Sequence, residues 1–76
     1  GLEVDFVLGM GEVALEIKGS GHVDKRDIHG LDAFTEACSP KKSILVCNEK
    51  EKRLHGKITI LPWEAFLREL WAGKVL

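Results

Sequence analysis

Three charged residues near the N-terminus have the types and the spacing of a site for a divalent metal ion. Asp5 lies in one short run of alternating apolar residues, and Glu16 and Lys18 lie in a second run. If the two runs form a hairpin centred between Met10 and Gly11, Asp5 faces Glu16 across the strands. Two carboxylates this close repel each other unless a positive charge lies between them. That charge is either Lys18 or a bound cation.

The chemistry that this arrangement supports is metal-dependent cleavage of phosphodiesters. Hard cations such as Mg²⁺ prefer carboxylate oxygens and usually keep several waters. A neighbouring lysine such as Lys18 stabilises an attacking hydroxide or a charged phosphoryl group. The alternative is a solvated strand face of alternating charges, on which Lys18 pairs with Glu3 as an ordinary surface salt bridge. The residues alone leave both interpretations open.

The opposite face of the same hairpin is predicted to be core. Side chains alternate between the two faces of a strand, so one set of apolar residues points away from the charges. These residues are Val4, Phe6, Leu8, Val13, Leu15 and Ile17. We therefore expect a hairpin with one buried face and one charged face.

The composition indicates one small folded domain over residues 1–76. Hydrophobic residues make up 45% of the chain and charged residues 30%, which is ordinary for globular proteins and excludes a disordered chain. A chain this short buries a small share of its surface, so its core must be thin. Eleven basic against twelve acidic residues give a net charge of -1, which excludes a polycation. Any phosphate contact must come from two local clusters, Lys41–Lys42 and Lys50–Arg53.

Neither the cysteine spacing nor the hydropathy indicates zinc or a membrane. Cys38 and Cys47 lack the paired spacing of zinc ligands, so we expect reduced, partly buried thiols. No apolar stretch approaches the roughly 20 residues that span a bilayer, and no signal peptide is visible. This predicts a cytoplasmic protein with no membrane partner. Because the chain begins at Gly1 without an initiator methionine and enters a strand almost at once, we expect a fragment of a longer protein.

The middle of the chain carries a helical pattern followed by a strand pattern. Asp24, with Asp27 three residues later, is a helix cap, and apolar residues recur at helical spacing up to Ser39–Pro40. The continuous apolar run Ser43–Cys47 is typical of a strand buried on both faces. Because this run follows a helical crossover, we expect it to pair in parallel with residues 13–18.

The C-terminal part is predicted to be a loop, a strand and a helix. Residues 48–57 are charged and are expected to form a surface loop, and Ile58–Leu61 is expected to form a short strand. Pro62 begins a helix that Gly73 ends. Its helically spaced apolar residues are interpreted as core or interface, and they are Trp63, Phe66, Leu67, Leu70 and Trp71. The predicted fold class is α/β, a small mixed β-sheet made of a hairpin plus a parallel strand, with flanking helices.

Two resemblances follow from these segments. Asp5 followed by Glu16-Ile17-Lys18, then by a helix and a buried strand, resembles the PD-(D/E)XK nuclease superfamily. More narrowly, the chain resembles the C-terminal domain of unknown function attached to prokaryotic AAA-type ATPases. The segments that carry this second likeness are Glu3–Val7, Ala14–Ser20, Gly30–Leu31 and Ile60–Trp63. The likeness covers nearly the whole chain and implies a truncated restriction-endonuclease-like core.

The superfamily resemblance implies a role for each residue of the motif. Asp5 and Glu16 are the metal-binding carboxylates, the Ile17 carbonyl completes the metal shell, and Lys18 assists the attacking water. The implied cofactor is Mg²⁺, with Mn²⁺ as a substitute, and the implied substrate is DNA. The narrower resemblance makes the chain the C-terminal part of a larger ATPase, with the N-terminal ATPase part of the same protein as its partner.

The chain departs from the superfamily pattern at its N-terminus. The superfamily core usually begins with a helix that carries another acidic residue and with one more strand, and this chain starts after both. Val4 replaces the proline that often precedes the aspartate. We therefore expect the fragment by itself to be inactive, and its uncovered sheet edge to make it self-associate.

Three hypotheses for function remain. The first is a nuclease-like module that binds magnesium and binds or cleaves DNA. The second is a non-catalytic assembly module that keeps the nuclease-like fold. The third is a small α/β interaction domain with no site. Metal affinity separates the first hypothesis from the others, and salt-dependent binding of nucleic acid separates the second from the third.

Overall fold

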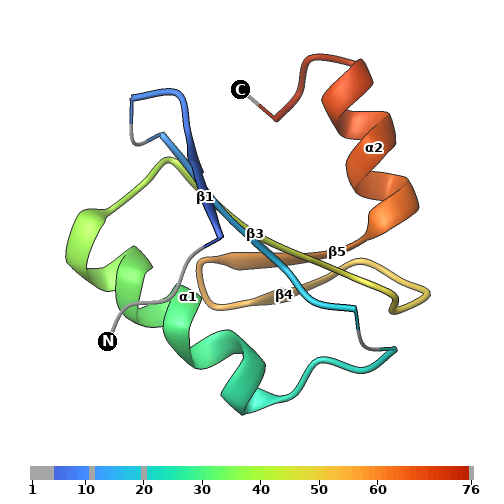
Figure 1. Ribbon diagram of the computed structural model, residues 1–76, viewed down its shortest axis with the longest axis horizontal. Helices are drawn as coiled ribbons and strands as arrows, with labels where there is room; N and C mark the ends of the chain where they lie inside the picture. The colour runs from blue at the N-terminus through green and yellow to red at the C-terminus, as the bar shows by residue number, and fades with distance from the viewer. Residues whose placement is uncertain (1–4, 11, 20, 76) are drawn as a thin grey trace.

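A five-stranded mixed sheet lies between two helices in this computed structural model, which describes residues 5–10, 12–19 and 21–75. The elements follow in the order β1 (Phe6–Leu8), β2 (Val13–Ile17), α1 (Lys25–Cys38), β3 (Lys42–Cys47), β4 (Arg53–His55), β5 (Ile58–Pro62) and α2 (Trp63–Trp71). The strands lie in the order β1-β2-β3-β5-β4. Figure 1 shows the two helices on opposite sides of the sheet.

The centre of the sheet is parallel and its two edges are antiparallel. β3 pairs in parallel with β2 on one side and with β5 on the other. β1 and β4 are the edge strands, and each pairs antiparallel with its neighbour. The predicted hairpin plus a parallel strand, flanked by helices, is therefore confirmed. The apolar run of β3 is buried throughout, as expected for a strand that is covered on both faces.

The core consists of two apolar clusters, one on each face of the sheet. The cluster under α1 contains Ala14, Val23, Ile28, Leu31, Leu45, Cys47, Ile58 and Ile60. The cluster under α2 contains Val13, Leu15, Ile44, Val46, Leu61, Phe66 and Val75. Successive residues of β2 and β3 alternate between the clusters because strand side chains alternate between faces.

The hairpin face that was predicted to be core is only partly buried. Leu8, Val13 and Leu15 pack in the α2 cluster as predicted. Phe6 and Ile17 are about half exposed, so their assignment to the core was wrong. The reason is that α2 contacts β3 and β5 and does not extend over the far ends of β1 and β2. Val4, which was predicted on the same face, lies outside the described residues.

Local capping sets the ends of α1 where the sequence predicts them. Asp24 accepts hydrogen bonds from the N–H groups of Arg26 (2.9 Å) and Asp27 (3.1 Å), and the Asp27 carboxylate accepts one from the Asp24 N–H (2.9 Å). The Asp27 N–H is the main cause of the lowered pKa of Asp24. Ser39 adopts a left-handed backbone (φ 47°) before Pro40, and this combination ends the helix.

A short strand lies inside the segment that was predicted to be a surface loop. Arg53–His55 forms β4, which pairs antiparallel with β5, so the interpretation of residues 48–57 as loop was wrong in that part. The two strands join through Gly56 (φ 58°) and Lys57, and a glycine with positive φ is what a tight hairpin turn requires. An exposed edge strand buries few side chains, so its sequence lacks the apolar alternation from which strands are predicted.

Helix α2 forms as predicted but buries less than predicted. It follows Pro62, and Gly73 (φ 74°) lies just beyond its end. Phe66 is the buried residue of its apolar stripe, whereas Trp63 is 48% exposed and Trp71 is 87% exposed. Of the two predicted alternatives, core or interface, the core is excluded for both tryptophans, and an interface role stays a prediction. A nine-residue helix on a narrow sheet inserts one row of side chains and leaves the flanking apolar residues in solvent.

The two cysteines differ in burial and are both free thiols. Cys38 is exposed, which corrects the expectation of a partly buried residue, and Cys47 is buried. Burial raises the pKa of the Cys47 thiol, so it stays protonated near neutral pH. Neither helix within the described ranges has the length and apolar character that a bilayer crossing requires.

Removing a side chain at the contact between α1 and the sheet tests this packing. Leu31 is fully buried in the α1 cluster. We expect Leu31→Ala to lower the free energy of unfolding by about 2–5 kcal/mol, because it removes apolar contacts and leaves a cavity. Leu54→Ala, at a residue that is 71% exposed, is the matched control and should change it by about 0.5 kcal/mol or less. Urea unfolding measures both values, and equal losses would contradict the packing described.

Candidate functional site

The register of the β1–β2 hairpin brings the predicted metal-binding carboxylates to facing positions. Phe6 pairs with Leu15, Val7 with Ala14 and Leu8 with Val13. This is the register that the sequence predicts. Continuing it by one residue beyond the end of β1 places Asp5 across from Glu16.

A hydrogen bond fixes the Asp5 carboxylate at the end of β2. Its Oδ2 accepts the backbone N–H of Ile17 at 2.7 Å, although Asp5 itself is exposed. Because Ile17 lies between Glu16 and Lys18 in the chain, this bond holds the Asp5 carboxylate beside the motif. The structure thus places Asp5 in contact with Ile17, and the grouping of the Asp5, Glu16 and Lys18 side chains into one site stays a prediction.

Glu16 lies in a different environment from the one predicted. Only 4% of this residue is exposed, so the alternative of a solvated, charged strand face is wrong at this position. Ala14, on the same face of β2, packs in the cluster under α1. The reason is the crossover between β2 and β3, which places α1 over this face of the sheet. A carboxylate in such a position interacts with a nearby cation more strongly than an exposed one does, since the surrounding dielectric is lower.

Lys18 extends the pairing of the two central strands and lines a cavity at their carboxyl ends. Its backbone N–H donates to the Val46 carbonyl oxygen at 2.8 Å. Its half-buried side chain borders a cavity of about 310 Å³, whose other walls include Val46, Asn48 and Trp63. In open α/β sheets, the carboxyl ends of parallel strands are the usual place for a ligand. The predicted cross-strand partner of Lys18, Glu3, lies outside the described residues.

The donor set at this position fits a hard divalent cation that keeps part of its water shell. Asp5 and Glu16 offer carboxylate oxygens from paired strands, which is the ligand type that Mg²⁺ prefers. In residues 5–10, 12–19 and 21–75, no three or more His, Cys, Asp or Glu side chains gather into a group that would enclose a metal. A cation held by these two carboxylates would need waters for the rest of its coordination shell. The Ile17 carbonyl as a further ligand stays a prediction.

A partly buried ion pair that the sequence did not indicate holds the loop before α1 against the loop before β4. Arg53 donates from Nε to Glu49 Oε1 (2.9 Å) and from Nη2 to Glu49 Oε2 (3.0 Å) and to the Val23 carbonyl oxygen (2.6 Å). Glu49 also accepts the Val23 N–H (2.6 Å), and His22 Nδ1 lies 4.0 Å from its Oε2. The segment Lys50–Arg53 was interpreted as a solvated loop, and this was wrong for Arg53. The spacing of Glu49 and Arg53 along the chain was the available signal.

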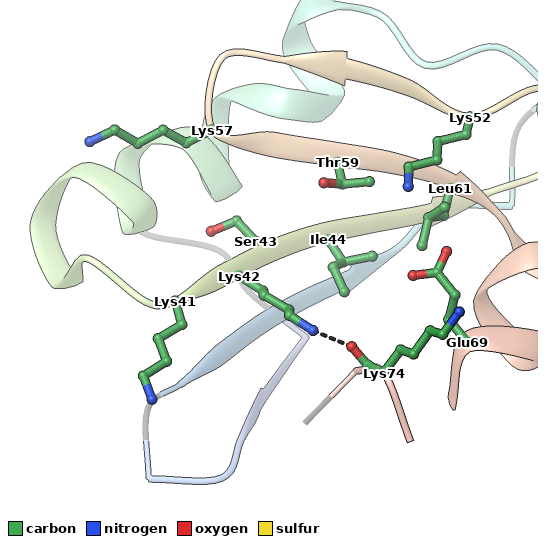
Figure 2. A pocket seen from close by; sticks show the side chains of 10 residues that line it. All are labelled: Lys41, Lys42, Ser43, Ile44, Lys52, Lys57, Thr59, Leu61, Glu69 and Lys74. Atoms are coloured by element: carbon green, nitrogen blue, oxygen red, sulfur yellow. Dashed lines mark hydrogen bonds between the residues drawn. The ribbon is translucent and has the colours of Figure 1, made fainter. Parts of the chain in front are cut away.

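The fold also gathers lysines that lie far apart in the sequence. Five of them, Lys41, Lys42, Lys52, Lys57 and Lys74, line a cavity of about 260 Å³ (Figure 2). The sequence shows only separate pairs and mixed-sign runs. No local pattern could reveal the cavity, because its lysines come from three segments that meet through the order of the strands.

No family model, no curated protein and no solved structure matches this chain.

The Glu49–Arg53 pair predicts a loss of stability in acid. The Arg53 guanidinium, hydrogen-bonded to the carboxylate, lowers the pKa of Glu49 from its ordinary 4.5 to about 2. A depressed folded-state pKa contributes stability that is complete above pH 4.5 and is lost as the pH falls from 4.5 to about 2. We expect Arg53→Gln to reduce the free energy of unfolding by about 1–2 kcal/mol at neutral pH and to flatten its decline in this pH window.

Urea unfolding at successive pH values measures this effect. Glu51→Gln is the matched control, because Glu51 is an exposed carboxylate in the same loop. A pH profile of Arg53→Gln that runs parallel to that of the unsubstituted chain would show that the pair has no such role.

Proposed function

We propose that this chain is a nuclease-like module that binds a divalent metal ion through Asp5 and Glu16 and acts on the phosphodiester bonds of DNA. The observation that carries the proposal is the hairpin register, whose continuation sets Asp5 across from Glu16, with Lys18 at the same end of β2. The hydrogen bond from Ile17 to Asp5 supports it, since it fixes the exposed carboxylate beside the buried one. The resemblance to the PD-(D/E)XK superfamily assigns the same residues.

Each residue contributes a different part of the proposed chemistry. Mg²⁺, or Mn²⁺ in its place, would supply Lewis-acid stabilisation of charge on a phosphoryl oxygen. Glu16 holds its carboxylate in a buried position, and Asp5 offers a carboxylate that solvent and substrate reach. The Lys18 ammonium, at the border of the adjoining cavity, stabilises negative charge on the attacking water or on the phosphoryl group. Hydrolysis adds water across one phosphorus–oxygen bond, leaving a phosphate on one product and a hydroxyl on the other.

We propose that cleavage needs more ligands than the described residues of this chain supply. Asp5 and Glu16 supply two protein ligands, whereas the superfamily pattern adds an acidic residue from an N-terminal helix. We propose that this helix and the N-terminal ATPase part belong to the parent protein and that they complete the site.

Calorimetric titration with MgCl₂ or MnCl₂ tests the metal site without requiring activity. We expect the chain to bind metal at millimolar concentration, and we expect Asp5→Asn and Glu16→Gln each to abolish the heat of binding. Glu51→Gln removes a carboxylate in a distant loop and should bind like the unsubstituted chain. Circular dichroism of Glu16→Gln checks that loss of binding is not loss of the fold. Absence of binding, or binding that both substitutions leave intact, would overturn the proposal.

A second candidate function is favoured by a separate observation. Beside the buried Phe66, α2 leaves four apolar side chains partly or largely exposed, and they are Trp63, Leu67, Leu70 and Trp71. Among the described strands, the edge strand β1 pairs with β2 alone, and Phe6 and Val7 are about half exposed. Exposed apolar residues on a helix and on an unpaired edge are typical of assembly surfaces. A non-catalytic assembly module with this fold would use them.

Self-association through the β1 edge is the measurable consequence of this second candidate. We expect light scattering at high micromolar concentration to show oligomers. Val7→Lys should shift the chain toward monomer, because a charge on an edge strand blocks pairing with another edge. Met10→Lys is the matched control, since it adds the same charge at a 98% exposed residue of the adjoining turn and should leave association unchanged. A strict monomer at these concentrations would contradict the expectation.

A further inference from the structure

A basic cavity opens on the face of the sheet that carries α2. Its volume is about 260 Å³, and its charged walls are Lys41, Lys42, Lys52, Lys57 and Lys74, with Glu69 as the one acidic residue among them. Ile44 and Leu61 of the α2 cluster form part of its apolar floor, and Thr59 adds a hydroxyl. Five of the eight lysines of the chain therefore surround one hollow.

This concentration of charge contrasts with the chain as a whole. The net charge is -1, so the protein as a body does not attract polyanions. Five positive charges against one negative charge give the cavity a local excess of four positive charges. A concave surface lined by one sign of charge focuses the electric field and attracts the opposite sign. The cavity is therefore the part of this structure that is suited to an anionic partner.

The fold builds this surface from three segments. Lys41 and Lys42 lie at the beginning of β3, Lys52 and Lys57 flank the short strand β4, and Lys74 follows α2. The Lys42 Nζ donates a hydrogen bond to the Lys74 carbonyl oxygen, which ties the C-terminal segment to the sheet. Figure 2 shows this contact and shows the lysine side chains spread around the hollow, with Lys41 and Lys57 reaching outward.

We infer that this cavity binds the phosphate backbone of a nucleic acid. Ammonium groups that converge on a point suit one small anion, whereas groups distributed along a surface suit the successive phosphates of a chain. Lysine acts as a point charge and does not demand the planar, bidentate geometry of an arginine contact, which is suited to backbone contacts that ignore sequence. The hydroxyl of Thr59 is a further donor of the kind that contacts phosphate oxygens.

This binding surface is separate from the proposed metal site. Lys42 and Lys57 lie at the amino ends of parallel strands, whereas Lys18 follows the carboxyl end of β2. Phosphate binding in the cavity therefore needs neither a metal ion nor Asp5. The inference shares its partner, DNA, with the proposed function but places it on another surface, and metal binding at Asp5 is measured separately from DNA binding in EDTA.

Fluorescence anisotropy with a labelled duplex DNA, in the presence of EDTA and over a series of KCl concentrations, tests the inference. Each phosphate neutralised by a lysine contributes about 0.9 to the slope of log K against log salt. We expect Lys52→Gln/Lys57→Gln to weaken binding at least about tenfold at low salt and to reduce that slope by about two. These two lysines are exposed, so circular dichroism should show an unchanged fold.

The matched control removes the same charge elsewhere. Lys25→Gln/Lys50→Gln replaces two exposed lysines outside the cavity, and we expect its affinity and slope to stay close to those of the unsubstituted chain. Asp5→Asn should also bind DNA normally in EDTA. Absence of DNA binding at low salt, equal weakening by the two double variants, or displacement of DNA by polyglutamate as effectively as by unlabelled DNA would each overturn the inference.

Discussion

The parallel pairing of β2 with β3 is the interaction on which the rest of the structure depends. These strands supply residues to both apolar clusters, and both helices pack against β3. Parallel strands require a crossover connection, and here α1 provides it and covers one face of the pair. The hydrogen bond from the Lys18 N–H to the Val46 carbonyl oxygen continues this pairing past the end of β2. The position of the candidate site is therefore set by the same contacts that form the core.

Because α1 covers this face of the sheet, the Glu16 carboxylate is buried. A carboxylate removed from water is unfavourable unless a cation or hydrogen-bond donors compensate it. Buried charged side chains in natural proteins occur most often at functional sites. At other buried positions, apolar residues are the rule. An apolar residue at position 16 would pack in the cluster under α1 without the unfavourable burial of a charge. The metal-binding role that we propose for Glu16 would account for a glutamate at that position.

The sequence predicted those features that depend on neighbouring residues. Alternating apolar residues around the Met10 turn predicted the hairpin register, and Asp24 with Asp27 predicted the start of α1. The parallel pairing of β3 followed from its continuous apolar run after a helical segment. In each case the signal is local or depends on one crossover.

The features that sequence analysis missed depend on the final arrangement of distant segments. Burial of Glu16 follows from the path of α1, and the exposure of Trp71 follows from how far α2 extends over the sheet. β4 forms because β5 offers it an edge, since its own residues carry little strand pattern. The lysine-lined cavity likewise exists only because the strand order brings Lys52 and Lys74 to one face.

The measurement that tests the central claim most directly is a Mn²⁺ titration followed by nuclear magnetic resonance of the backbone amides. Paramagnetic Mn²⁺ broadens the signals of nuclei close to it. If Asp5 and Glu16 hold the ion together, the amide signals of Asp5, Glu16, Ile17 and Lys18 should broaden first, at metal concentrations that leave the Glu51 loop unaffected. Broadening that begins at other carboxylates, or that affects all exposed acidic residues equally, would contradict a shared metal site at the end of β2.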